Sequence, residues 1–231
     1  MKKQFILVLL FAVLSFSACH QVSRPASGDY KLTPWIAVTS ADQPIYSTPS
    51  EHQHWRYLQP ILLTSLGQSA DILVAQAAME RLQIPYASLP VASAQDLTEY
   101  KTIFIIVGVS KTGMNRAGTS EQEELQRAQA LADAITAAKD KTVILCHIGG
   151  VNRRSDTSDR LAMLIAPCCN DILLREEGNQ DGFFTTMGED LHIPVTLMYT
   201  NQQLLTFLQQ HFAYVYPHGS SQLKTTAHHT E

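Results

Sequence analysis

Two kinds of apolar pattern alternate along the chain. Short runs of consecutive apolar residues are typical of strands that are covered on both faces in a parallel sheet. Longer segments with apolar residues every three to four positions are typical of helices that pack one face on such a sheet. The short runs predict strands at residues 60–65, 84–89, 102–108, 143–147, 171–175 and 194–198. The run TIFIIVG at 102–108 is the most apolar of them and predicts the central strand.

The segments between these runs predict the helices. We expect helices at residues 69–82, 120–139 and 201–212, a helical turn at 96–100, and a further helix that begins at Asp159. The helix at 120–139 opens with SEQE, in which Ser120 and Glu123 form a capping box. For the helix from Asp159, Ser158 is the predicted N-terminal cap. Its apolar face carries Leu161, Ala162, Leu164 and Ile165.

Strands that alternate with helices indicate a parallel sheet with right-handed crossover connections. We therefore predict an α/β fold, a three-layer sandwich with a mostly parallel sheet in flavodoxin-like or Rossmann-like strand order. Residues 35–38 are predicted to add an edge strand, and residues 40–55 are predicted to form a loop.

The first residues predict export. Lys2 and Lys3 precede an apolar run at 5–16, which is too short to span a bilayer stably and has the pattern of a secretory signal. The small residues before Cys19 resemble the lipobox of bacterial lipoproteins, in which the cysteine is acylated; ordinary cleavage that leaves a plain thiol is the alternative. His20 follows, without an aspartate to signal inner-membrane retention, so the resemblance implies the outer membrane, facing the periplasm, in a Gram-negative cell.

Four parts of the chain follow from these patterns. Residues 1–18 are the predicted lipoprotein signal peptide, 19–34 a flexible tether, 35–216 a single α/β domain and 217–231 a disordered tail. Without residues 1–18 the chain has 15 basic and 21 acidic residues, a net charge near −6. Nucleic acid is therefore not an expected partner, because no basic surplus is present to displace counterions. Contact with the membrane is expected through the lipid alone.

The cysteines do not predict a metal site. Cys146 falls in a predicted strand, where a buried small thiol is common. Cys168 and Cys169 are adjacent, and neighbouring cysteines rarely bridge each other without strain. The CxxC and His/Cys spacings typical of zinc are missing from the sequence. We therefore predict no metal and no cofactor.

Polar, glycine-bearing loops follow four of the predicted strands, whereas the helices carry most of the acidic residues. The loops read TSLGQSAD, GVSKTGMNRAG, HIGGVNRRSDTSD and EEGNQDGFF. Parallel strands end at one edge of the sheet, where ligands bind in α/β proteins. Glycine turns, cationic side chains and helix N-termini together form an anion site. The predicted ligand-binding residues are Ser65, Gly67, Gln68, Ser69, Ser110, Lys111, His147, Gly149, Gly150, Arg153, Arg154, Asn179 and Asp181.

Each of these features also has a structural explanation. GVSKTG lacks the GxxxxGK[ST] order of a P-loop, and glycines are needed in tight turns whatever the function. Arg153 and Arg154 carry adjacent like charges, which a ligand or internal carboxylates such as Asp156 and Asp159 would satisfy equally well. His147 is a candidate acid, base or hydrogen-bond donor, and a satisfied buried histidine is the alternative.

In this order, the four loop motifs resemble a family of exported bacterial proteins filed as a domain of unknown function. The similarity covers residues 62–212 and implies an exported α/β domain that shares these loops, with no established activity. The family's glycine-rich loop more often reads SSKGLGAAG, and its GGEARRG motif appears here as GGVNRRS. Val151 stands in place of the acid, which argues against a metal or acid–base role at that position. The glycine-rich loop departs at Val109, Thr112, Met114, Asn115 and Arg116.

Three functions are consistent with these patterns. The leading hypothesis is a lipid-anchored envelope protein that binds a small anionic molecule in a crevice at the carboxyl ends of the strands. The alternative is an envelope hydrolase or transferase that uses His147 as acid or base with Asp181 or Asp159. No GxSxG elbow is present to support a serine nucleophile. A third hypothesis is a scaffold or interaction lipoprotein, and any transporter or receptor partner is unknown.

Overall fold

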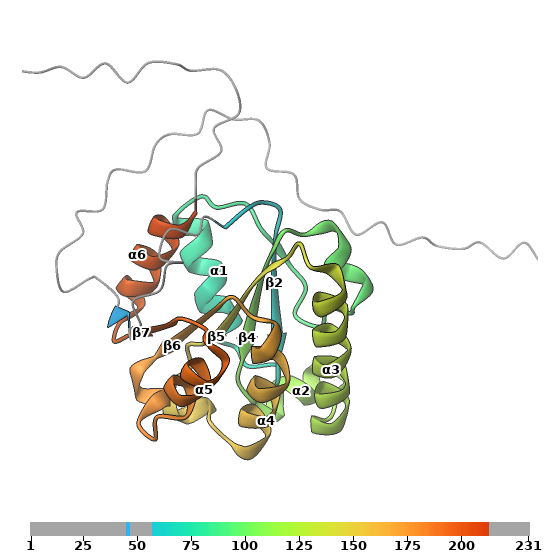
Figure 1. The fold of residues 1–231 in the computed structure, drawn as a ribbon. Coiled ribbons are helices and arrows are strands. Elements are labelled where there is room, and N and C mark those ends of the chain that lie inside the picture. The colour runs from blue at the N-terminus through green and yellow to red at the C-terminus, as the bar shows by residue number, and fades with distance from the viewer. Residues whose placement is uncertain (1–44, 47–56, 213–231) are drawn as a thin grey trace, which may run out of the picture. The chain divides into compact units, whose positions relative to one another are not determined.

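A seven-stranded sheet forms the middle layer of the structure, a computed structural model that describes residues 45–46 and 57–212 (Figure 1). The strand order is β1-β7-β6-β5-β4-β2-β3, and β1 pairs antiparallel with β7 while the other neighbours pair in parallel. The strands are β1 (Ile45–Tyr46), β2 (Ile61–Leu66), β3 (Ala87–Ser88), β4 (Thr102–Val107), β5 (Thr142–His147), β6 (Asp171–Arg175) and β7 (Val195–Met198).

Helices cover both faces of this sheet. They are α1 (Ile72–Arg81), α2 (Lys111–Ala117), α3 (Glu121–Ala138), α4 (Asp156–Ile165), α5 (Phe183–Leu191) and α6 (Asn201–His211). Short 3₁₀ turns lie at η2 (Gln95–Glu99), η3 (Gly150–Arg153), η4 (Ala166–Cys168) and η5 (Glu176–Asn179). Helices α1 and α6 pack on one face and α3, α4 and α5 on the other (Figure 1). The predicted three-layer α/β sandwich with a mostly parallel sheet is confirmed.

The six parallel strands follow the flavodoxin-like order, because the first of them, β2, lies between the second and the third. The sequence left flavodoxin-like and Rossmann-like order open, and the structure has the flavodoxin-like order. The direction of winding reverses between β2 and β4. Ligands of doubly wound proteins bind outside such a reversal, at the carboxyl ends of the two strands.

Alternate residues of each central strand supply two separate apolar cores. Leu62, Ile105 and Leu145 face α3 and α4, whereas neighbours such as Phe104 and Ile144 face α1 and α6. All residues of β2 and β4 are buried. This explains why these strands appear in the sequence as unbroken apolar runs rather than as alternating patterns.

Helix starts were predicted with mixed success. The capping box of Ser120 and Glu123 at α3 is confirmed. The predicted start of the next helix is wrong: α4 begins at Asp156, and its N-cap is Ser155. Ser158, the predicted cap, is the third helical residue, and its hydroxyl accepts a hydrogen bond from the Ser155 N–H at 2.7 Å. The pair is a capping box with serine in place of the usual glutamate, a variant that the sequence pattern does not signal.

Four other segments differ from prediction. Residues 111–117, expected as loop, form α2, and the loop expected after β6 leads directly into α5. Both helices contain an internal glycine, which lowers helix propensity, so tertiary packing decides their structure. At Gly188 in α5, a β-carbon would lie 2.2 Å from the side chain of Val195, so α5 approaches β7 too closely for any larger residue. Strand β1 lies inside the predicted loop at 40–55, and β3 spans two residues rather than six.

The predictions for 1–18, 19–34 with Cys19, 35–38 and 217–231 lie outside the described residues. Within the described residues, none of the helices has the length and apolar character needed to cross a bilayer.

Tyr57 joins the two ends of the segment 57–212 at the amino edge of the sheet. Its N–H donates to the carbonyl oxygen of His211 at 2.8 Å, and its ring stacks on that of His211 with centroids 5.2 Å apart. The Tyr57 hydroxyl donates to Asp171 at 2.5 Å. Burial raises the pKa of Asp171 to about 6, although the bond from Tyr57 acts in the opposite direction. Asp171 is therefore a destabilising charge at neutral pH.

Asp171→Asn is expected to stabilise the domain above pH 6. A pKa of about 6 in the folded state, against 3.8 for an aspartate in the unfolded chain, gives stability that is present below pH 4 and lost as pH rises through 6. Urea unfolding at pH 8 should show a gain of about 2–3 kcal/mol for the variant, and the gain should shrink at pH 4.5. Burial lowers the pKa of His211, which changes stability in the opposite direction with pH. Both forms contain His211, so their difference isolates Asp171, and a pH-independent difference would contradict the prediction.

Candidate functional site

Three loops meet at the carboxyl edge of the sheet, where the winding reverses. They follow β2, β4 and β5, and they contact one another around Gly108. A β-carbon at Gly108 would lie 3.1 Å from Ser69 Oγ and 3.2 Å from Arg153 Cβ. Ser69 Oγ donates to Asp71 at 2.8 Å, and Arg153 Nε lies 3.4 Å from the same carboxylate oxygen. We call Ser69, Asp71, Gly108, Gly149 and Arg153 the rim site.

Arg153 is held loosely at the rim site. Its side chain is 32% exposed, and within residues 57–212 the carboxylate that it contacts is Asp71. The stem of Arg153 packs on Gly149, where a β-carbon would lie 2.2 Å from Arg153 Cγ and 2.2 Å from Asp71 Oδ2. Glycine at 149 therefore makes room for the Arg153–Asp71 pair, and about a third of the Arg153 side chain stays exposed.

Arg154 is held by internal acids instead. It makes two hydrogen bonds to Asp159, at 2.7 and 2.9 Å, and two to Asp181, at 3.1 and 2.9 Å. Its guanidinium also lies 4.8 Å from the centroid of the Phe183 ring. The hydrogen bonds to Asp159 are the main cause of a raised Arg154 pKa, and Arg154 in turn lowers the pKa of Asp181. Of the two carboxylates considered from the sequence, Asp159 is the partner, and Asp181 takes the place of Asp156.

His147 is fully buried between backbone carbonyl groups. Nδ1 lies 2.9 Å from the oxygen of Val107 and Nε2 lies 3.1 Å from that of Gly150, while the ring stacks on Phe184. Burial is the largest effect on the His147 pKa and lowers it. A neutral ring donates from one nitrogen only, so one of the two carbonyl groups accepts its hydrogen bond and the other lies close to the second nitrogen. The polar groups that His147 contacts are backbone carbonyls, whereas Asp159 and Asp181 bond to Arg154.

Sequence reasoning missed a buried ion pair beneath the rim. The Glu124 side chain on α3 is fully buried and lies 2.7 Å from Arg127. It also accepts hydrogen bonds from the Gly67 N–H at 2.7 Å and from the Gln68 amide at 3.3 Å. Arg127 donates in addition to the carbonyl oxygens of Ser65 and Ala92. One feature of the sequence could have indicated that Glu124 is buried. It falls on the same helix face as the apolar residues Ala128, Leu131 and Ile135.

Other predicted site residues support local structure. Ser110 caps α2, its hydroxyl accepting from the Gly113 N–H at 3.0 Å, and Lys111 is exposed at the start of that helix. Asn179 accepts from the first N–H groups of α5, at 2.9 and 3.3 Å. The Ser65 hydroxyl is buried and has no hydrogen-bond partner among the described residues. The structure thus brings the loops together, but most of their polar groups bond to one another.

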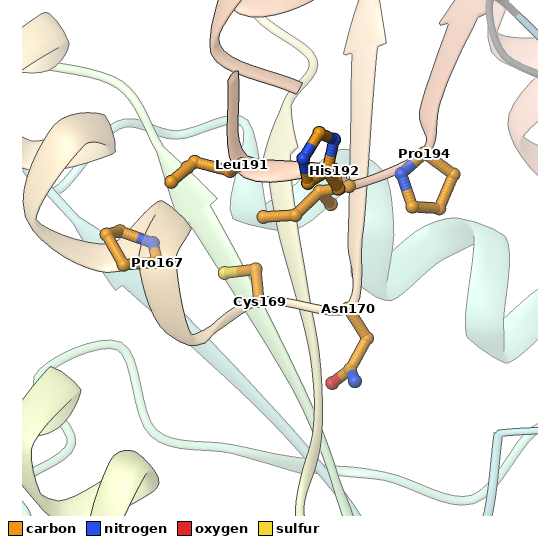
Figure 2. A pocket seen from close by; sticks show the side chains of 7 residues that line it. Pro167, Cys169, Asn170, Leu191, His192 and Pro194 are labelled. Atoms are coloured by element: carbon orange, nitrogen blue, oxygen red, sulfur yellow. The ribbon is translucent and has the colours of Figure 1, made fainter. Parts of the chain in front are cut away.

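A cavity of about 230 Å³ lies at the other edge of the sheet, among the residues that precede β6 and β7 (Figure 2). Its walls are Pro167, Cys169, Asn170, Leu191, His192, Ile193 and Pro194. No group of three or more possible metal ligands occurs among the described residues.

The fold and the rim define the class of this protein as a doubly wound α/β protein with loops converging where the winding reverses. Residues 58–212 match the family model described as a domain of unknown function, DUF6305, and the chain belongs to that family. No curated protein matches this chain, so the comparison adds no activity to the fold.

Glu124→Ala is expected to lower the free energy of unfolding by about 3 kcal/mol or more, because Arg127 would keep a largely buried charge without its partner. Urea unfolding of Glu124→Ala, Arg127→Ala and the double variant measures the coupling between them. The double variant should lose at least about 1 kcal/mol less than the sum of the single losses. Additive losses would contradict a paired role.

Arg154→Ala and Arg153→Ala are expected to differ in stability although the residues are neighbours. The first leaves Asp159 and Asp181 facing each other without a cation and should cost about 2 kcal/mol. The second removes a single long contact at a partly exposed site and should cost less than about 1 kcal/mol. Equal losses in urea unfolding would show that the four hydrogen bonds from Arg154 to the two carboxylates contribute little.

Proposed function

We propose that this protein is a lipid-anchored envelope protein that binds a small anionic molecule at the rim site, with Arg153 as the principal contact. Carboxylates and phosphate esters are the chemical classes that a guanidinium recognises through paired hydrogen bonds. Ser69 would contribute a hydroxyl group, and Ser110 and Lys111 stand at the start of the neighbouring helix. Lipid on Cys19 and export remain part of the proposal and rest on the sequence.

The observation that carries the proposal is the partly exposed side chain of Arg153 at the switch point. It contacts one carboxylate at 3.4 Å and is one-third exposed, whereas Arg154 is saturated by two. An anionic ligand would compete with Asp71 for Arg153, which favours a ligand that can also receive a hydrogen bond from Ser69. Arg154, Asn179 and Asp181, predicted as contacts, are better assigned to holding the loops in position.

The enzyme hypothesis receives less support from the same contacts. A general acid or base must reach the substrate, and the His147 ring is buried with both nitrogens directed at carbonyl groups. Docking of another protein is the second candidate. Three large apolar side chains near the carboxyl ends of the strands, Leu73, Val151 and Tyr199, are 60%, 55% and 48% exposed. Such side chains would contribute to an interface.

The test is thermal unfolding of the full chain in low-salt buffer with inorganic phosphate, citrate or acetate. A ligand at 100 times its Kd adds about 2.7 kcal/mol, which raises the Tm by about 5–10 °C in a domain of this size. Arg153→Ala should abolish the rise. Arg160→Ala is the matched control, because Arg160 is an exposed cation on α4 outside the rim site and its removal should leave the rise intact.

Equal responses in wild type and Arg153→Ala would refute the rim site. No response to any of the three anions, together with an intact fold by circular dichroism, would favour the docking candidate instead.

A further inference from the structure

A pair of thiols lies at the amino edge of the sheet, away from the rim site. Cys168 ends the η4 turn, Cys169 follows it, and β6 begins two residues later at Asp171. Cys169 lines the cavity of about 230 Å³ (Figure 2), and in that view its sulfur points to the side of Pro167 and Leu191 while Asn170 points away. The function proposed above uses none of these groups.

Both sulfur atoms are directed at one oxygen. Cys168 Sγ lies 3.0 Å and Cys169 Sγ 3.2 Å from the carbonyl oxygen of Ile165, the last residue of α4. The side chains therefore leave the backbone on the same side, which brings the two sulfur atoms near each other. This is the arrangement needed for transfer of a sulfur bond from one to the other.

The two thiols have different environments. Cys168 is partly exposed, and the neighbouring Cys169 thiol lowers its pKa. Cys169 is 8% exposed, and burial raises its pKa well above the ordinary value. Burial also raises the pKa of Cys146 in β5, which is 1% exposed. Thiolate is the reactive form of cysteine, so Cys168 is the best nucleophile of the three.

We propose that Cys168 and Cys169 form a reversible thiol–disulfide site that accepts oxidising equivalents from low-molecular-weight disulfides. The Cys168 thiolate attacks one sulfur of the disulfide, the disulfide bond breaks, and the leaving thiolate takes a proton from solvent. Cys169 then loses its proton to solvent and attacks Cys168 Sγ. The mixed disulfide breaks, the second small thiol leaves with a proton, and a Cys168–Cys169 disulfide is formed.

The bridged form should be easy to reduce again. Adjacent α-carbons are about 3.8 Å apart across a trans peptide, below the lower limit of about 4.4 Å for ordinary disulfides. Strained disulfides have more oxidising potentials and are the labile ones. The cavity beside Cys169 provides space for its sulfur to leave the Ile165 carbonyl.

The simpler explanation is that both thiols cap the C-terminus of α4. A weak S–H donor to the Ile165 carbonyl would satisfy one of the unpaired oxygens of the last helical turn. A capping role predicts that the cysteines are interchangeable with serine and react with similar, low rates. A capping role does not predict that Cys168 reacts first with a small disulfide and that Cys169 then releases the small thiol from Cys168.

The test treats the reduced full chain with oxidised glutathione and identifies products by mass spectrometry of peptides, which separates Cys168 and Cys169 from Cys19 and Cys146. Wild type should lose two hydrogen atoms from the peptide that contains both cysteines. Cys169→Ser should trap glutathione on Cys168. Cys168→Ser cannot form the bridge, and glutathione should attach to its Cys169 more slowly than to Cys168 in Cys169→Ser. Modification of Cys168 should be at least about tenfold faster than that of Cys146.

Cys146→Ser is the matched control and should react as wild type does, because Cys146 is outside the pair. Cys169→Ala replaces Cys169→Ser if serine disturbs the buried position, with folding checked by circular dichroism. Dithiothreitol should reverse the bridge at concentrations that leave an unstrained disulfide intact. The proposal is overturned if folded Cys169→Ser or Cys169→Ala stays unmodified at Cys168, or if Cys146 reacts as fast.

Discussion

The buried carboxylate of Glu124 is the constraint on which the carboxyl edge depends. A charge without contact with solvent is stable only if cations and N–H groups surround it. Glu124 meets this requirement with Arg127, the Gly67 N–H and the Gln68 amide, so α3 fixes the loop that follows β2. Gln68 consequently has φ of 57°, a backbone conformation held by its surroundings. The loops after β4 and β5 then pack against this fixed loop.

This arrangement separates two roles that the sequence had combined. Glycines, arginines and a histidine in strand-end loops describe an anion site and a set of tightly packed loops equally well. At Gly113, for example, a β-carbon would lie 1.9 Å from the Gln68 carbonyl oxygen, so this glycine serves contact between loops. Arg154 bonds to Asp159 and Asp181, and the Arg153 side chain stays partly exposed. Two adjacent arginines thus have opposite roles, which only their partners distinguish.

Features with a local cause were predictable, and features with a tertiary cause were not. The apolar runs at β2 and β4 result from burial on both faces of the sheet, and these two strands were predicted correctly. The Ser120 capping box depends only on residues within one helical turn, and it is also confirmed. Helix α5 forms on packing against β7 despite its threonines and Gly188. Glu124 pairs locally with Arg127, but its hydrogen-bond donors Gly67 and Gln68 are 57 and 56 residues away. The sequence also left the strand order open. The order depends on which strand each new strand pairs with after its crossover helix, and this pairing is decided by tertiary contacts.

The contact of Tyr57 with the end of α6 has a consequence for orientation. Residues 57 and 212 pair as neighbours, so the segment 57–212 starts and finishes at the same place, at the amino ends of the strands. Strand β1 runs the other way: it is antiparallel to β7, with Ile45 opposite Leu197 and Tyr46 opposite Thr196. The described chain therefore enters the sheet from the carboxyl side, the side on which Arg153 lies, and its last helix ends at the amino side.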